Sequence, residues 1–170
     1  MGNGYRFVLF TGSRHFLRDP AGARVVQNEI RRVVREEAHA KLVQFVMGDA
    51  PGVDPWSKYF GHREGVQNYI FTLNGRYRLY STESLYLDVG SWDHGMSTID
   101  ERPRPIQRDE AMVKWTYAKA NGSGKCYAFE HLGAPTNGTR TTVEFWKKQP
   151  EMLPFEHYVW DGASLCLSPP

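Results

Sequence analysis

The sequence predicts an α/β fold of three layers, in which helices cover both faces of a mostly parallel sheet of about five strands. The first observation behind this prediction is that short apolar runs alternate with stretches of helical periodicity. The second is that glycine-containing turns follow three of the apolar runs, at 11–14, 48–54 and 133–139. With 170 residues, 41% of them hydrophobic, the chain fits one domain with one core. We therefore expect a single domain over 1–170.

The expected elements follow from apolar patterning and from residues that start or stop helices. The run 7–10 is continuously apolar, which is typical of a strand buried on both faces. A helix over 20–40 has Asp19 as its candidate N-cap, Pro20 in its first turn and apolar residues at helical spacing. The other expected strands span 42–47, 66–73, 125–131 and 155–160, and the other expected helices span 53–64, 103–120 and 138–148. We expect 168–170 to be frayed.

Residues 74–102 interrupt this alternation with glycine, polar and aromatic residues. Because a structureless loop of this length is unusual, we interpret the segment as an insertion that serves as a lid or an interaction surface, with short strands inside it. Its aromatic residues lie near cations: Tyr77, Tyr80, Tyr86 and Trp92 beside Arg76, Arg78, Arg102 and Arg104. Such a mixture can stack the bases of a single-stranded nucleic acid, cover an adenine or form a protein interface, although ordinary packing is the simplest role.

Composition argues against several classes of function. The formal net charge of +2 gives no strong electrostatic case for binding nucleic acid or a membrane. Cys126 and Cys166 lack metal-ligand spacing, the histidines form no H-x-x-x-H pair, and no run approaches the roughly 20 apolar residues of a membrane span. We therefore expect a cytoplasmic protein without a disulfide, metal or cofactor, with a homodimer as a possible assembly.

The first turn, Thr11-Gly12-Ser13-Arg14, follows a buried strand. A glycine there lets backbone N–H groups approach a phosphate, Ser13 adds a hydroxyl donor and Arg14 can pair with phosphate in bidentate fashion. The alternative is a plain turn with a surface arginine. The Walker loop and the full dinucleotide fingerprint are both absent.

Three later segments add further candidate ligand residues. The segment 48–54 contains the glycines Gly48 and Gly52 and the acids Asp49 and Asp54. Either acid can accept hydrogen bonds from a ribose or cap the next helix, and capping is the commoner role for Asp54. The segment Gln107-Arg108-Asp109-Glu110 begins a helix, where Arg108 can enter a pocket or all the charges can face water. The segment Asn137-Gly138-Thr139 opens the last helix, whose free N–H groups suit a phosphate and whose Thr139 can cap it or bind the ligand.

Taken in this order, the four segments resemble the SLOG superfamily, most closely its small stand-alone branch of YspA-like and YpsA-like proteins of bacteria and phages. The resemblance covers roughly 5–148 without the insertion. It implies a modified Rossmann-like fold that binds nucleotides or nucleotide-derived ligands. Relatives include DNA-processing domains of the DprA type and the Lonely Guy phosphoribohydrolases, which cleave the base from nucleoside monophosphates.

In the hydrolase branch of this superfamily an arginine and a glutamate carry the chemistry. Arg108 matches the arginine, whereas Thr142 occupies the expected place of the glutamate and Glu144 lies two residues further on. The Pro-Gly-Gly that precedes Gly-Thr in that branch is replaced by Ala134-Pro135-Thr136-Asn137. The resemblance therefore favours binding over catalysis.

Three functions follow as hypotheses. The first is binding of a nucleotide-like small molecule as a sensor or sequestering protein, with phosphate at 11–14 and 137–139, added charge from Arg108 and Asp49 or Asp54 at the ribose. The second is hydrolysis of an N-glycosidic bond in a nucleoside monophosphate by Arg108 with Glu144 or an aspartate. The third is a module for single-stranded nucleic acid or protein that acts through the insertion.

Overall fold

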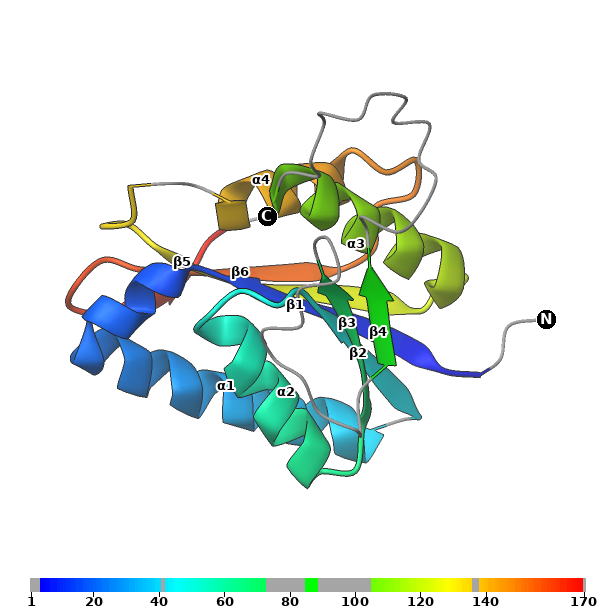
Figure 1. The fold of residues 1–170 in the computed structure, drawn as a ribbon, viewed down its shortest axis with the longest axis horizontal. Helices are drawn as coiled ribbons and strands as arrows, with labels where there is room; N and C mark the ends of the chain where they lie inside the picture. Colours follow the sequence, from blue (N-terminus) through cyan, green and yellow to red (C-terminus); the bar gives the residue numbers. More distant parts are fainter. Residues whose placement is uncertain (1–3, 41, 73–84, 89–104, 136–137, 170) are drawn as a thin grey trace.

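The computed structural model describes residues 4–40, 42–72, 85–88, 105–135 and 138–169 (Figure 1). These residues form one seven-stranded sheet in the order β4-β3-β2-β1-β5-β6-β7. The strands are β1 (Arg6–Gly12), β2 (Val43–Met47), β3 (Gln67–Thr72), β4 (Leu85–Asp88), β5 (Gly124–His131), β6 (Phe155–Trp160) and β7 (Leu165–Leu167). All neighbouring strands are parallel except β6 and β7, which are antiparallel.

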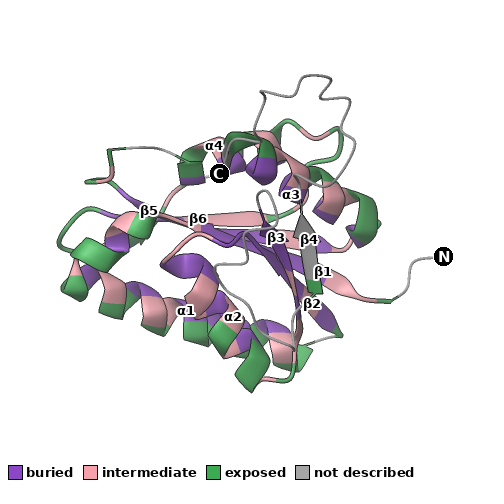
Figure 2. Ribbon diagram, viewed as in Figure 1, coloured by how far each residue is buried: buried purple, intermediate pink, exposed green. Residues whose placement is uncertain are grey.

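Helices cover both faces of this sheet. They are the 3₁₀ helix η1 (Arg14–Arg18), α1 (Pro20–Ala40), α2 (Val53–Arg63), α3 (Pro105–Ala120) and α4 (Gly138–Lys147). Residues of α1 and α2 pack on one face of the sheet, and residues of α3 and α4 pack on the other. Figure 2 shows the central strands and the inward sides of the helices as buried. The predicted three-layer α/β fold is therefore confirmed.

The predicted number of strands was too small. Strand β4 lies inside the expected insertion and extends the sheet beside β3, with Tyr69 paired to Leu85. Strand β7 is a three-residue edge strand whose side chains are mostly exposed, and its three apolar residues are too short a run to predict a strand. The rest of the insertion, including the expected Tyr77, Tyr80, Trp92, Arg76 and Arg78, lies outside the described residues, as does the side chain of Tyr86.

The start of α1 agrees with the sequence prediction. Asp19 accepts a hydrogen bond from the backbone N–H of Gly22 at 3.0 Å, which is the N-cap interaction, and Pro20 is the first helical residue. The same carboxylate accepts hydrogen bonds from the Trp160 indole at 2.8 Å and bonds to the His131 ring at 2.9 Å. The cap therefore ties α1 to the ends of β5 and β6.

None of the helices in the described part of the chain has both the length and the apolar character needed to cross a bilayer.

Candidate functional site

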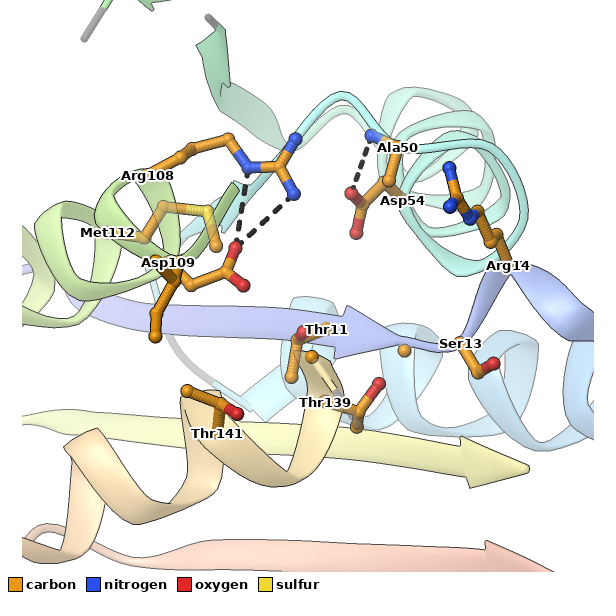
Figure 3. Close-up of a pocket in the computed structure, with 13 residues that line it drawn as sticks. Thr11, Ser13, Arg14, Ala50, Asp54, Arg108, Asp109, Met112, Thr139 and Thr141 are labelled. Carbon is orange, nitrogen blue, oxygen red and sulfur yellow. Dashed lines mark hydrogen bonds and ion pairs between the residues drawn. The ribbon is translucent and has the colours of Figure 1, made fainter. Parts of the chain in front are cut away.

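A cavity of about 370 Å³ lies where β1 ends and where α2, α3 and α4 approach it (Figure 3). From β1 the chain passes to β2 and β3 on one side, whereas β5 continues to β6 on the other side. The boundary between β1 and β5 is thus a topological switch point, the place where parallel α/β sheets bind ligands. The lining residues are Thr11, Gly12, Ser13, Arg14, Ala50, Asp54, Ile106, Arg108, Asp109, Met112, Gly138, Thr139 and Thr141.

Position 12 requires a glycine because β1 packs closely against α2 there. A Cβ atom at Gly12 would lie only 2.3 Å from a methyl carbon of Val53, so the absent side chain lets β1 end directly against the start of α2. This is the role of a glycine in close helix–strand packing, whereas the sequence suggested close approach to a phosphate. Gly52, at φ +100°, begins the same helix and lies against the backbone of Ser13.

The hydroxyl and the backbone N–H of Ser13 already form hydrogen bonds within the protein. Its hydroxyl oxygen accepts a hydrogen bond from the backbone N–H of His15 at 3.1 Å and caps η1. Its own N–H donates to the carbonyl of Phe129 at 3.0 Å. The backbone N–H of Ser13 is therefore not free to bind a phosphate, although the residue lines the cavity. Arg14 follows it with an exposed side chain, and within the described part of the chain it forms no ion pair.

Arg108 is the buried cation of the site. Its guanidinium donates to Asp49 at 2.8 Å and to Asp109 at 3.3 Å from two nitrogens, and all three side chains are less than a tenth exposed. Burial opposes the charge of Arg108, but Asp109, Asp54 and Asp49 outweigh it and raise the pKa of the guanidinium. Of the two alternatives that the sequence left open for this turn, the one in which all the charges face water is therefore wrong for Arg108 and Asp109.

Gly48 leaves room for this arginine. A Cβ at Gly48 would lie 2.9 Å from Oδ2 of Asp54 and 3.1 Å from Nε of Arg108. The end of β2 can therefore accept both side chains only when it carries no side chain of its own at this position.

Asp54 does not cap α2, contrary to the expectation from sequence. The N-cap position of α2 is Gly52, which makes no side-chain cap, and Asp54 lies inside the first turn. Its Oδ2 accepts a hydrogen bond from the backbone N–H of Ala50 at 3.0 Å. Burial raises the pKa of this carboxyl to about 7, although Arg108 and the Ala50 N–H oppose the rise. Asp54 is thus a buried acid that titrates near neutral pH.

The start of α4 forms the opposite wall of the cavity. Gly138 has open space around it, with Oδ2 of Asp109 at 3.9 Å as the nearest atom to a Cβ placed there. Thr11 and Thr139 are 7% and 5% exposed, and neither hydroxyl has a hydrogen-bond partner among the described residues. Asn137, which the sequence also assigned to the ligand, lies outside the described residues.

Most of the residues predicted from the sequence meet at this cavity, but some do not. Gly48, Asp49 and Gly52 do not line it. Glu144 is exposed and 3.9 Å from Lys147, and it does not line the cavity. The lining residues that the sequence prediction missed are Ala50, Ile106, Asp109, Met112 and Thr141. Helical spacing was the available signal, since Met112 lies one turn beyond Arg108 and Thr141 one turn beyond Gly138.

No group of three or more His, Cys, Asp or Glu side chains in the described residues is arranged to hold a metal ion. Comparison with known proteins adds no family assignment: no protein-family model matches the chain, and no curated protein matches it significantly.

Proposed function

We propose that the cavity binds a nucleotide or a nucleotide-derived small molecule, with its phosphate at the start of α4. The observation that carries this proposal is that α4 begins at the cavity wall beside two hydroxyls that have no protein partner among the described residues. The first N–H groups of an α-helix have no partner within the helix, and its dipole favours an anion there. Thr139 and Thr11 supply hydroxyl donors to the same space.

The size and position of the cavity support a small-molecule ligand. A volume of about 370 Å³ falls in the lower part of the usual range for ligand pockets, roughly 300–1,000 Å³. Arg14 lines the cavity with an exposed side chain, and its planar guanidinium is well suited to donate hydrogen bonds to a phosphate. The resemblance to the SLOG superfamily is consistent with such a ligand.

Binding without cleavage accords better with the geometry than base hydrolysis does. The glutamate nearest to the position used in the hydrolase branch, Glu144, is exposed and does not line the cavity. Arg108, the arginine that matches that branch, is engaged by Asp49 and Asp109.

Thermal unfolding and calorimetry with AMP, ADP-ribose, NAD, cyclic nucleotides and inorganic phosphate test the proposal. We expect at least one nucleotide to raise the unfolding midpoint, since a ligand that binds only the native state stabilises it. Arg14→Gln should weaken that binding about tenfold, because it removes a charge-assisted hydrogen bond to phosphate. Arg31→Gln, at an exposed arginine on α1, is the matched control and should bind as the wild type does. A folded protein that responds to no compound of the panel would contradict the proposal.

A further inference from the structure

The cavity wall formed by α2, α3 and the end of β2 holds more acidic than basic groups. Three carboxylates, those of Asp49, Asp54 and Asp109, surround the single guanidinium of Arg108. Asp49 and Asp109 contact it directly, and their hydrogen bonds compensate its charge. Asp54 forms no ion pair among the described residues, and its interaction with Arg108 is a longer-range electrostatic attraction without a direct contact. Asp54 is therefore the acid of this wall whose negative charge is not compensated by a direct ion pair.

One carboxylate oxygen of Asp54 has no hydrogen-bond partner within the part of the chain that the structure describes. Oδ2 accepts the hydrogen bond from Ala50, whereas Oδ1 accepts none from the described residues. The residue is 6% exposed and lines the cavity. Figure 3 shows its carboxyl turned into the space between Arg108 and Arg14. Oδ1 does not belong to the buried oxygens that lack a partner, so it is open to the cavity, and a ligand that supplies a donor or a positive charge can form a charge-assisted hydrogen bond with it there.

The opposite side of the cavity has the reverse preference. The helix start at Gly138 and the hydroxyl of Thr139 favour an anion. A ligand with only a phosphate would be attracted at this end and repelled by the acidic wall. A ligand that carries charges of both signs would satisfy both ends of the cavity.

We propose that the cavity selects a zwitterionic phosphate ester, whose phosphate lies at the start of α4 and whose amine or other cationic group bonds to Asp54. This inference rests on the proposed function and specifies the class of ligand for the same site. Asp54 would be a specificity-determining residue. The charged groups that face it are Arg108 and Asp109 from α3, Asp49 from the loop after β2, and Arg14 from η1.

Two pairs of compounds that differ mainly in a positive charge provide the test: 1-methyl-AMP against AMP, and phosphoethanolamine against ethyl phosphate. At about pH 8 we expect the cationic member of at least one pair to bind about tenfold more tightly, since hydrogen bonds between charged groups are stronger than neutral ones. The preference should shrink toward about pH 6, where Asp54 gains a proton and loses its charge.

Asp54→Asn should abolish the preference, because the amide keeps an acceptor for Ala50 but carries no charge. Asp161→Asn, at an exposed acid in the turn between β6 and β7, is the matched control and should retain the preference. Equal binding of both members of each pair, or a preference that survives in Asp54→Asn, would overturn this inference and leave the proposed function standing. If none of these compounds, nor any nucleotide or inorganic phosphate, binds the folded protein, both proposals are overturned.

Discussion

Gly12 and Gly138 both line the cavity, yet the space around them differs. A Cβ at Gly12 would lie within 3 Å of three carbons of Val53, whereas for Gly138 the nearest non-neighbouring atom among the described residues is Oδ2 of Asp109 at 3.9 Å. One glycine therefore serves the packing of β1 against α2, and the other leaves the entrance to the α4 N–H groups open. A single glycine letter in the sequence cannot distinguish these two roles, because the difference lies in a neighbour about forty residues away.

Alanine substitutions separate the two roles. Gly12→Ala should lower the free energy of unfolding by about 1–3 kcal/mol, since overpacking forces Val53 or the backbone to move. Gly138→Ala should leave stability nearly unchanged and reduce ligand affinity, because its methyl group enters the cavity. Urea denaturation of both variants provides the measurement. Equal stability of Gly12→Ala and the wild type would refute the packing role.

Asp54 predicts a particular pH dependence of stability. Its pKa is raised from 3.8 to about 7, so the native state binds more protons than the unfolded state between these values. The free energy of unfolding should therefore fall as pH rises from about 4 to about 7 on account of this group and then level off, by up to about 4 kcal/mol. Asp54→Asn removes the titrating group and should flatten this part of the profile.

Urea denaturation at about pH 5 and about pH 8 measures this contribution. Glu144→Gln, which removes an exposed carboxyl outside the cavity, is the control. A profile that is the same for Asp54→Asn and the wild type would show that the Asp54 carboxyl is not perturbed by its burial.

The elements with strong local signals were predicted well. Apolar runs located β1 and β2, because strands buried on both faces are largely apolar along their length. The Asp19-Pro20 pair located the start of α1. Strand β7 and helix η1 escaped prediction because three and five residues are too few to show the period of a strand or of a helix.

The candidate site was predicted in its turns but not in its acidic wall. Glycines and hydroxyls at strand ends identified 11–14 and 138–139 as a common site. The interaction of Arg108 with Asp49 spans 59 residues of sequence and depends on how α3 packs beside the end of β2, which no local pattern encodes. For the same reason Asp54 was expected at a helix cap, although its environment is set by α3.

At the level of elements, Asp19 fixes α1 to the sheet as well as capping it. Asp19→Ala removes acceptors for the Gly22 N–H, the Trp160 indole and the His131 ring together. We expect a larger loss of stability than the loss of an N-cap alone would cause, because three interactions are removed together. Hydrogen exchange should show faster exchange at Gly22, and urea denaturation should give the free energy of unfolding. Unchanged stability would contradict the anchoring role.

At the scale of the whole molecule, the cavity joins both layers of helices. Asp54 belongs to α2 on one face of the sheet, whereas Arg108 and Thr139 belong to α3 and α4 on the other. The sheet has a buried apolar core on each face, with Ile30 in the first and Val113 in the second. A ligand at this cavity would contact elements from both layers, so its binding should depend on the fold as one cooperative unit.

Cooperativity of this kind can be tested with one core variant on each face. Ile30→Val and Val113→Ala each remove buried carbons and leave a small cavity in a packed core, and each should cost about 1 kcal/mol of stability. If the protein unfolds in one step, the nucleotide that binds best at 100 times its Kd should stabilise the wild type and both variants by the same amount, about 2.7 kcal/mol. Denaturant unfolding with and without that nucleotide gives the three increments. A smaller increment in Val113→Ala alone would show that α3 and α4 can loosen independently of the α1–α2 face, and would contradict a single cooperative unit.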